Sequence, residues 1–302
     1  MKATYAHTML FASTMQLATL ISSVAAQSVK AFNDSLSNHN NFIVANGYGP
    51  ERWGCSFVKT QVHQSGEGTT ITIGKDSPTK PYSCGELIYR QANMSYGTYS
   101  IEMIASKTVG QVTSFFLIAN GDTEIDVELT GLDTKLGWMN VWHNNQQNPV
   151  SVELPFDVST DWHSYSFDWY KDHIVWWVDG DMVLNRSDIA TTPPDRVSYK
   201  LAINSWAQVQ PEVNIDWAGK FNYPPDGEVP KAHFRNMKYI PRVYDSKGNI
   251  VSGGDDSKSN GANLGGNNKK KSNAEISKSP TGALAIAGIG MVAVAFAFTI
   301  LF

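Results

Sequence analysis

Three carboxylates stand at alternate positions in the segment Glu124-Ile125-Asp126-Val127-Glu128. In a β-strand, side chains two residues apart share a face, so the three acids would project to one side while Ile125 and Val127 face the other. Neighbouring like charges raise one another's pKa values, a cost that a purely structural strand has no need to accept. Hydrolysis of a glycosidic bond does need such a group, because one carboxylate attacks the anomeric carbon and a second protonates the leaving oxygen.

The spacing of the outer two acids sets a geometric condition. The Cα atoms of Glu124 and Glu128 would lie about 13 Å apart in an extended strand. Their side chains must therefore converge above the sheet to reach the roughly 5–5.5 Å that separates a retaining pair. Asp126 lies between them and can hold the nucleophile by a shared proton, which helps to separate the pKa of the base from that of the acid. A solvent-facing strand with an acidic edge is the alternative that the pentapeptide alone leaves open.

Aromatic and amide side chains that suit a sugar ligand follow this segment. An indole offers a flat face on which a pyranose ring can stack, and a side-chain amide can bond sugar hydroxyls. We expect Asn140, Trp142 and Trp206 to bind substrate. Trp138 could also offer a ring for stacking, and Asn204 could also bond sugar hydroxyls. The tryptophans that we instead expect to pack in the core are Trp162, Trp169, Trp177 and Trp217.

Short strands must position these residues. Alternating apolar and polar runs recur about every ten residues between positions 40 and 243, as at 69–73, 97–103 and 164–169. Residues 174–178 and 181–184 flank Asp179-Gly180, which predicts a hairpin with a two-residue turn. No segment of this stretch keeps a 3.6-residue apolar period, so we expect an all-β sandwich of two antiparallel sheets.

The composition excludes several other classes of protein. Only 17% of the 302 residues are charged, below the roughly 25% of typical soluble domains, which argues against a disordered chain or a charged coiled coil. The 24 basic and 28 acidic residues give a net charge of −4, and no basic face indicates a nucleic-acid partner. The histidines show no metal-ligand spacing, so we expect no metal and no cofactor.

The two ends of the chain differ from its middle. Residues 1–26 have a lone Lys2 ahead of an uncharged stretch that closes on Val24-Ala25-Ala26, which predicts a signal peptide cleaved before residue 27. A buried N-terminal helix is the alternative, although nothing caps or continues it. Residues 27–41 then form an N-terminal segment ahead of the folded domain.

The C-terminal residues fit a lipid-attachment signal. Residues 283–302 are uncharged and mostly apolar, long enough to cross a hydrocarbon core of about 30 Å, but no basic residue follows them. Small residues at 272–274, a polar spacer and this tail match a GPI-attachment signal over 273–302, with Ser272 as the attachment residue and Asn273 or Ala274 as alternatives. A tail-anchored transmembrane helix is the alternative. Residues 246–272 are rich in Gly, Ser and Asn and predict a flexible linker.

In a secreted chain, cysteines can form disulfides and asparagines can be glycosylated. Cys55 and Cys84 are expected to form a disulfide, because paired cysteines are the default outside the cytosol. The Asn-x-Ser sequence of a glycosylation site occurs at Asn33, Asn93 and Asn185.

Taken together, several motifs resemble glycoside hydrolase family 16. The segment from Glu124 to Glu128 matches the catalytic strand of that family, in the form without an inserted residue. Further motifs occur in the order found in bacterial lichenases: Asn46-Gly47-Tyr48, Cys84-Gly85-Glu86, Tyr96-Gly97-Thr98-Tyr99, Ser114-Phe115-Phe116, the run from Trp162 to Trp169, and Trp177-Val178-Asp179-Gly180. The resemblance covers about residues 42–240.

The resemblance implies a fold, a mechanism and roles. It implies a β-jelly-roll with a concave glucan-binding cleft over residues 42–245, and a retaining mechanism. Glu124 would be the nucleophile, Asp126 its assistant and Glu128 the acid/base, while Trp142 and Trp206 would line the cleft. The chain departs from the family at Thr123, where many members have Asp.

The same resemblance leaves the reaction outcome open. We expect a monomeric, retaining endo-β-glucanase acting on β-1,3/1,4-type cell-wall glucans, carried to the cell surface and held at the outer face of the plasma membrane by the lipid anchor. Segments 205–207 and 215–219 look more like fungal cell-wall chitin–glucan transglycosylases, so a wall transglycosylase using the same intermediate is the alternative. A non-catalytic glucan-binding module is the third hypothesis, which the intact row of carboxylates disfavours.

Overall fold

The structure, a computed structural model, describes residues 30–49, 54–77, 80–119, 123–143, 146–188, 199–209 and 215–253. The predicted signal peptide, the predicted attachment signal and Ser272 lie outside the described residues. Within the described ranges, no helix is long and apolar enough to cross a membrane.

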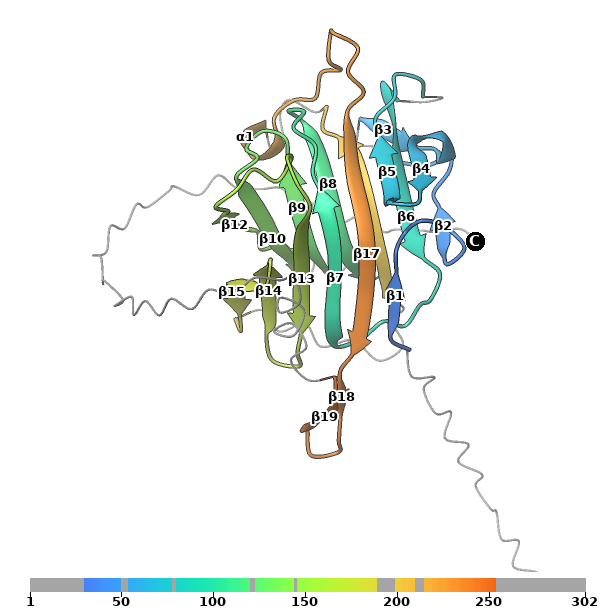
Figure 1. Cartoon of the computed structure of the whole chain (residues 1–302). Helices are drawn as coiled ribbons and strands as arrows, with labels where there is room; N and C mark the ends of the chain where they lie inside the picture. Colours follow the sequence, from blue (N-terminus) through green and yellow to red (C-terminus); the bar gives the residue numbers. More distant parts are fainter. Residues whose placement is uncertain are drawn as a thin grey trace, which may run out of the picture.

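Two large β-sheets pack face to face and form the whole body of the described domain (Figure 1). The described strands of the first sheet, in spatial order, are β15 (Asp181–Arg186), β14 (Ile174–Val178), β13 (His163–Trp169), β7 (Gly97–Ile104), β17 (Lys231–Pro241), β5 (Gly68–Thr72) and β4 (Val62–Ser65), with β1 (Phe32–Asp34) beside β17. We call this the eight-stranded sheet.

The second sheet contains the acidic segment in a strand that has neighbouring strands on both sides. Its described strands, in spatial order, are β11 (Gln146–Gln147), β10 (Leu136–His143), β9 (Thr123–Thr130), β8 (Gln111–Ala119), β16 (Lys200–Ala207), β6 (Tyr82–Tyr89) and β2 (Phe42–Val44), with β12 (Val150–Glu153) beside β10 and β3 (Cys55–Phe57) beside β6. We call this the nine-stranded sheet. Its pairs are antiparallel except β3 with β6, which is parallel.

The remaining described elements are small: η1 (Lys59–Gln61), α1 (Ile215–Ala218), β18 (Val243–Tyr244) and β19 (Ile250–Ser252). Strands β18 and β19 pair with each other, so the first residues of the predicted linker form a hairpin. The all-β prediction and the two-layer arrangement are confirmed.

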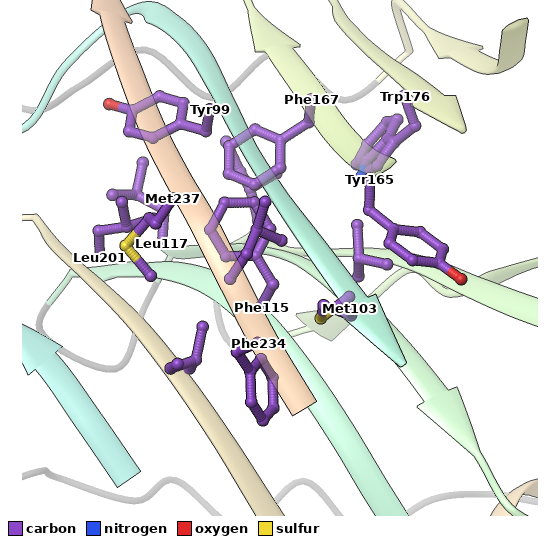
Figure 2. Packing of buried hydrophobic residues seen from close by; sticks show 14 of the residues in the cluster. Tyr99, Met103, Phe115, Leu117, Tyr165, Phe167, Trp176, Leu201, Phe234 and Met237 are labelled. Atoms are coloured by element: carbon purple, nitrogen blue, oxygen red, sulfur yellow. The ribbon is translucent and has the colours of Figure 1, made fainter. Parts of the chain in front are cut away.

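The core lies between the two sheets, and Figure 2 shows side chains from both layers meeting there. Tyr99 and Phe167 from the eight-stranded sheet stack with centroids 4.9 Å apart, and Phe167 also contacts Phe115 of the nine-stranded sheet at 5.5 Å. Burying each such side chain contributes roughly 1.5–3 kcal/mol. Because alternate residues of the long strands enter this layer, the other alternate set must face outward.

Sequence patterning located the strands well. The runs at 69–73, 97–103 and 164–169 fall on β5, β7 and β13. The predicted hairpin is β14–β15, and its turn residues Asp179 and Gly180 both have positive φ, at 51° and 85°. Two positive φ values are characteristic of the type I′ turn that matches strand twist.

The tryptophan predictions were partly wrong. Trp169 is fully buried in the main core, as expected. Trp162 and Trp177 are partly exposed and lie outside it, because they alternate with the inward-facing residues of β13 and β14. Trp217 packs against a smaller second cluster around Trp206.

The disulfide prediction is confirmed. Cys55 of β3 and Cys84 of β6 are bonded across the parallel strand pair, with Cα atoms 5.7 Å apart. Both cysteines are buried in the second cluster. A cross-link that closes a loop of 29 residues contributes about 3–4 kcal/mol by the chain-entropy relation.

Candidate active site

The three acids lie on β9 near the middle of the nine-stranded sheet, between β8 and β10. Ile125, Val127 and Leu129 point into the main core. Glu124, Asp126 and Glu128 therefore share the opposite face, which we call the catalytic face, as the period of two predicts. The two glutamates are partly exposed, whereas Asp126 is 2% exposed.

Asn140 holds Asp126 from the neighbouring strand. The two residues are directly opposite in the β9–β10 register. The Asn140 amide nitrogen donates to Asp126 Oδ2 at 3.1 Å, and its oxygen accepts from the backbone N–H of Asn148 at 3.0 Å. Asn140, which we expected to bind substrate, is only 3% exposed. Its side chain bonds both Asp126 on β9 and the backbone of Asn148, so the structure shows it as a positioning residue for Asp126.

Burial and charge together disfavour ionisation of Asp126. Burial raises the pKa of its carboxyl well above the usual range, the charges of Glu128 and then Glu124 raise it further, and the hydrogen bond from Asn140 opposes the shift. Asp126 Oδ1 has no hydrogen-bond partner among the described residues. A neutral Asp126 would thus carry its proton on Oδ1, because Oδ2 already accepts from Asn140.

The opposite sheet fixes the centre of the catalytic strand. The indole N–H of Trp176, a buried residue of β14, donates to the backbone oxygen of Asp126 at 3.1 Å. A hydrogen bond made across the core limits sliding of β9 along its length. Trp176 therefore links the packing of the sandwich to the placement of the acids.

Buried polar atoms without partners gather on the catalytic face. Asn204, Ser114, Glu128 and Trp138 are paired in one row across β16, β8, β9 and β10. Within the described residues, Asn204 Oδ1, Ser114 Oγ and Trp138 Nε1 lack hydrogen-bond partners, as Asp126 Oδ1 does. Buried polar groups are nearly always bonded in folded proteins, so such a group of exceptions indicates a place for a polar ligand or water.

The same row continues to a group that sequence reasoning did not assign to the site. Glu86 of β6 pairs with Asn204, is 6% exposed, and accepts hydrogen bonds from the Tyr48 hydroxyl at 2.6 Å and the Asn204 amide at 3.2 Å. Burial raises the pKa of Glu86, and both hydrogen bonds and Lys200 oppose the shift. Tyr48 and Glu86 stand in the motifs Asn46-Gly47-Tyr48 and Cys84-Gly85-Glu86. These motifs indicated the family but not the place of the two residues in the site.

The two predicted cleft tryptophans differ in exposure. Trp142 lies opposite Glu124 in the β9–β10 register and is partly exposed. Trp206 is only 6% exposed and packs on Trp217 with ring centroids 6.0 Å apart. Trp142 thus has an accessible surface beside the nucleophile candidate, whereas Trp206 offers a ligand no more than a small part of its ring.

The three candidate glycosylation sites lie at the surface of the domain. Asn33 in β1, Asn93 between β6 and β7, and Asn185 in β15 are all exposed.

Among the described residues, no group of three or more His, Cys, Asp or Glu side chains is arranged to hold a metal ion.

A two-layer β-sandwich with this row of acids on the outward face of an interior strand has the layout of a glycoside hydrolase. Residues 50–219 match the family described as glycosyl hydrolases family 16, and the chain belongs to this family.

The relatives of the chain are named as glucanases. It is 34% identical over 199 residues to a beta-glucanase of Acetivibrio thermocellus, a match over 62% of this chain and 55% of that protein. It is 30% identical over 219 residues to the beta-glucanase of Bacillus licheniformis, over 69% of this chain and 86% of that protein. The match thus spans about half the length of the first relative and most of the second.

Solved structures share the fold. The Bacillus licheniformis beta-glucanase superposes with a TM-score of 0.62 at 27% identity, over 72% of this chain and 100% of that one. The Crh5 transglycosylase superposes with a TM-score of 0.55 at 18% identity, over 70% and 84% of the two chains, and at this identity it shows the fold alone.

The raised pKa of Asp126 predicts a pH-dependent stability. The folded chain holds this proton more tightly than the unfolded chain, so stability falls as pH rises from the unfolded pKa of about 4 through the folded pKa. Asp126→Asn cannot ionise, so we expect its free energy of unfolding to gain on that of wild type as pH rises, while activity is lost. Urea unfolding at a series of pH values measures the difference. A difference that shrinks with rising pH would contradict this account.

Proposed function

We propose that the chain is a retaining endo-β-glucanase that hydrolyses O-glycosidic bonds in β-1,3/1,4-type cell-wall glucans. The observation that carries the proposal is the register of β9, which brings Glu124, Asp126 and Glu128 to one face with the buried Asp126 between them. Membership of family 16 and relatives named as beta-glucanases support the substrate class.

The reaction proceeds in two displacements on this face. Glu124 attacks the anomeric carbon while Glu128 gives its proton to the leaving oxygen, so the glycosidic C–O bond breaks as the glycosyl–Glu124 ester forms. Glu128, now a carboxylate, takes a proton from water, and the resulting nucleophile displaces Glu124 from the sugar. A proton on Asp126 Oδ1, which makes no hydrogen bond among the described residues, would be shared with the carboxylate of Glu124 once the side chain turns toward it, and this would moderate the charge of Glu124 before attack and after release.

Substrate would bind along the row that contains Glu128. Asn204, Ser114 and Trp138 present polar atoms there that no described residue bonds. Glu86 on β6 and Tyr48 in the loop before β3 extend the row. Sugar hydroxyls can both donate and accept hydrogen bonds, so they match a mixture of amide, hydroxyl, indole and carboxyl groups. Trp142 supplies a stacking surface beside Glu124.

The division of labour between the two glutamates predicts a dependence on the leaving group. In Glu128→Ala, hydrolysis of glucan should fall by about 10²–10⁴-fold because general acid catalysis is lost. Aryl glycosides with good leaving groups need little protonation, so their first step should fall much less. Glu153→Gln, in the exposed part of β12, is the matched control and should behave as wild type. Equal losses on both substrates would show that Glu128 is not the acid.

A wall transglycosylase is the second candidate, supported by segments 205–207 and 215–219 and by the predicted lipid anchor. Incubation with β-glucan and a fluorescent oligosaccharide acceptor separates the two. Hydrolysis leaves shortened, unlabelled chains, which is the result we expect, whereas transfer moves label into polymer.

Glu124→Gln should give neither product, and its turnover should be below about one per cent of wild type, a loss of at least about 2.7 kcal/mol of transition-state stabilisation.

We further propose that the protein is a monomeric, glycosylated surface protein. The pattern of residues 1–26 supports entry into the secretory pathway, and the pattern of 273–302 supports a GPI anchor at Ser272 on the outer face of the plasma membrane, next to the cell wall. The predicted linker would allow the domain to reach the wall. Retention on cells after treatment with phosphatidylinositol-specific phospholipase C would argue against the anchor.

A further inference from the structure

A hollow lies on the side of the sandwich opposite the catalytic face. It has a volume of about 400 Å³, is open to solvent, and is lined by Ser35, Gly66, Glu67, Trp162, Arg235 and Asn236. Glu102, which supports it, alternates with the core residues Ile101 and Met103 and so lies on the outward face of the eight-stranded sheet. A volume of about 400 Å³ falls within the range of small-molecule sites, but a ligand in this open hollow would keep part of its surface in solvent. We call it the outer hollow.

The Glu102 carboxylate binds two of the side chains that line the outer hollow. Glu102 Oε2 accepts from Arg235 Nε at 2.6 Å, and Glu102 Oε1 accepts from the Asn236 amide at 2.9 Å. The Arg235 guanidinium in turn lies over the Trp162 ring, 4.1 Å from its centroid. Hydrogen bonds to a carboxylate and a cation–π contact hold these four side chains in one arrangement.

Backbone irregularities shape the rim. The β17–β7 register shifts between Arg235 and Lys238, and Asn236 within this bulge has a φ of +55°. Leu36, next to Ser35, has a φ of +60°, and is held by Asp34 Oδ1, which accepts from its N–H, and by the Thr69 hydroxyl, which donates to its carbonyl. β-Bulges re-aim side chains and non-glycine residues with positive φ are costly, so both are features that the surrounding structure maintains.

The charges of the outer hollow select the class of ligand. Arg235 is neutralised by Glu102, and Glu67 adds another negative charge, so these three side chains sum to −1. A phosphate, sulfate or carboxylate would meet net repulsion. A neutral ligand with many hydroxyls would find an indole, a guanidinium, an amide, a serine hydroxyl and a carboxylate, which together supply both donors and acceptors.

We propose that the outer hollow is a second, non-catalytic saccharide-binding site. The saccharide has two sources: a segment of wall β-glucan, or the chain's own N-linked glycan at Asn33, whose Asn33-Asp34-Ser35 sequence ends on a lining residue. Binding here does not require any role of Glu124 or Glu128, since the site lies on the other sheet. It would hold polymer or glycan on one face while the other face carries out the reaction.

Two variants remove the site by different means. Trp162→Ala deletes the aromatic wall, and Gly66→Leu fills the hollow from a position where an added Cβ meets no atom within 4 Å. Lys238→Ala is the matched control, on the same strand and the same outward face but outside the lining. If wall glucan occupies the hollow, retention on immobilised mixed-linkage β-glucan should fall about fivefold in Trp162→Ala, as expected for loss of one aromatic contact. It should fall at least as much in Gly66→Leu and be unchanged in the control.

The second arm separates the two sources. In protein secreted by a glycosylating host, the Trp162→Ala and Asn33→Gln changes should shift the thermal unfolding midpoint non-additively if the Asn33 glycan occupies the hollow. Weaker glucan retention supports the wall polymer, and non-additive unfolding supports the glycan. Wild-type retention by both site variants together with additive unfolding would overturn the proposal. Hydrolysis of a short soluble oligosaccharide by the wild-type protein reports the catalytic face separately, so a failure there concerns only the proposed function.

Discussion

The strict alternation of β9 is the constraint on which the rest of the site depends. A single strand must supply Ile125 and Val127 to the core and place three carboxylates on the opposite face. A slip of one residue would exchange the two sets and bury all three acids, so the register has to be fixed strongly. Pairing with β8 and β10 on both sides, and the hydrogen bond from Trp176 across the core, provide that fixation.

Electrostatics follows from the same placement. The central acid is enclosed by its neighbours and by Asn140, so burial and the two flanking glutamates raise the pKa of Asp126 and disfavour its ionisation, which costs stability as pH rises. Polar atoms of Ser114, Trp138 and Asn204 on the same face, which have no hydrogen-bond partner in the described part of the chain, are a second cost. Natural proteins accept such losses at functional sites and recover the stability elsewhere, here through an aromatic core and a disulfide.

Local patterns predicted much of this molecule, and long-range contacts supplied the rest. Alternation and turn chemistry located β9 and the type I′ turn at Asp179-Gly180, because both depend on neighbouring residues. The hydrogen bond between Glu86 and Asn204 joins residues 118 positions apart, and no local pattern reveals it. Trp162 was assigned to the core because an aromatic residue at the start of a strand does not show which face it takes. Its contacts with Arg235 and His233 of β17, which come from a distant part of the sequence, place it on the outward face.

The central claim is that Glu124 and Glu128 carry out two successive displacements, so that the sugar keeps its configuration at the anomeric carbon. Proton NMR spectroscopy of the products during the first minutes of glucan hydrolysis, before mutarotation, measures this directly. The account predicts that the β-anomer of the new reducing end appears first and the α-anomer only later. Initial release of the α-anomer would mean a single displacement and would contradict the account.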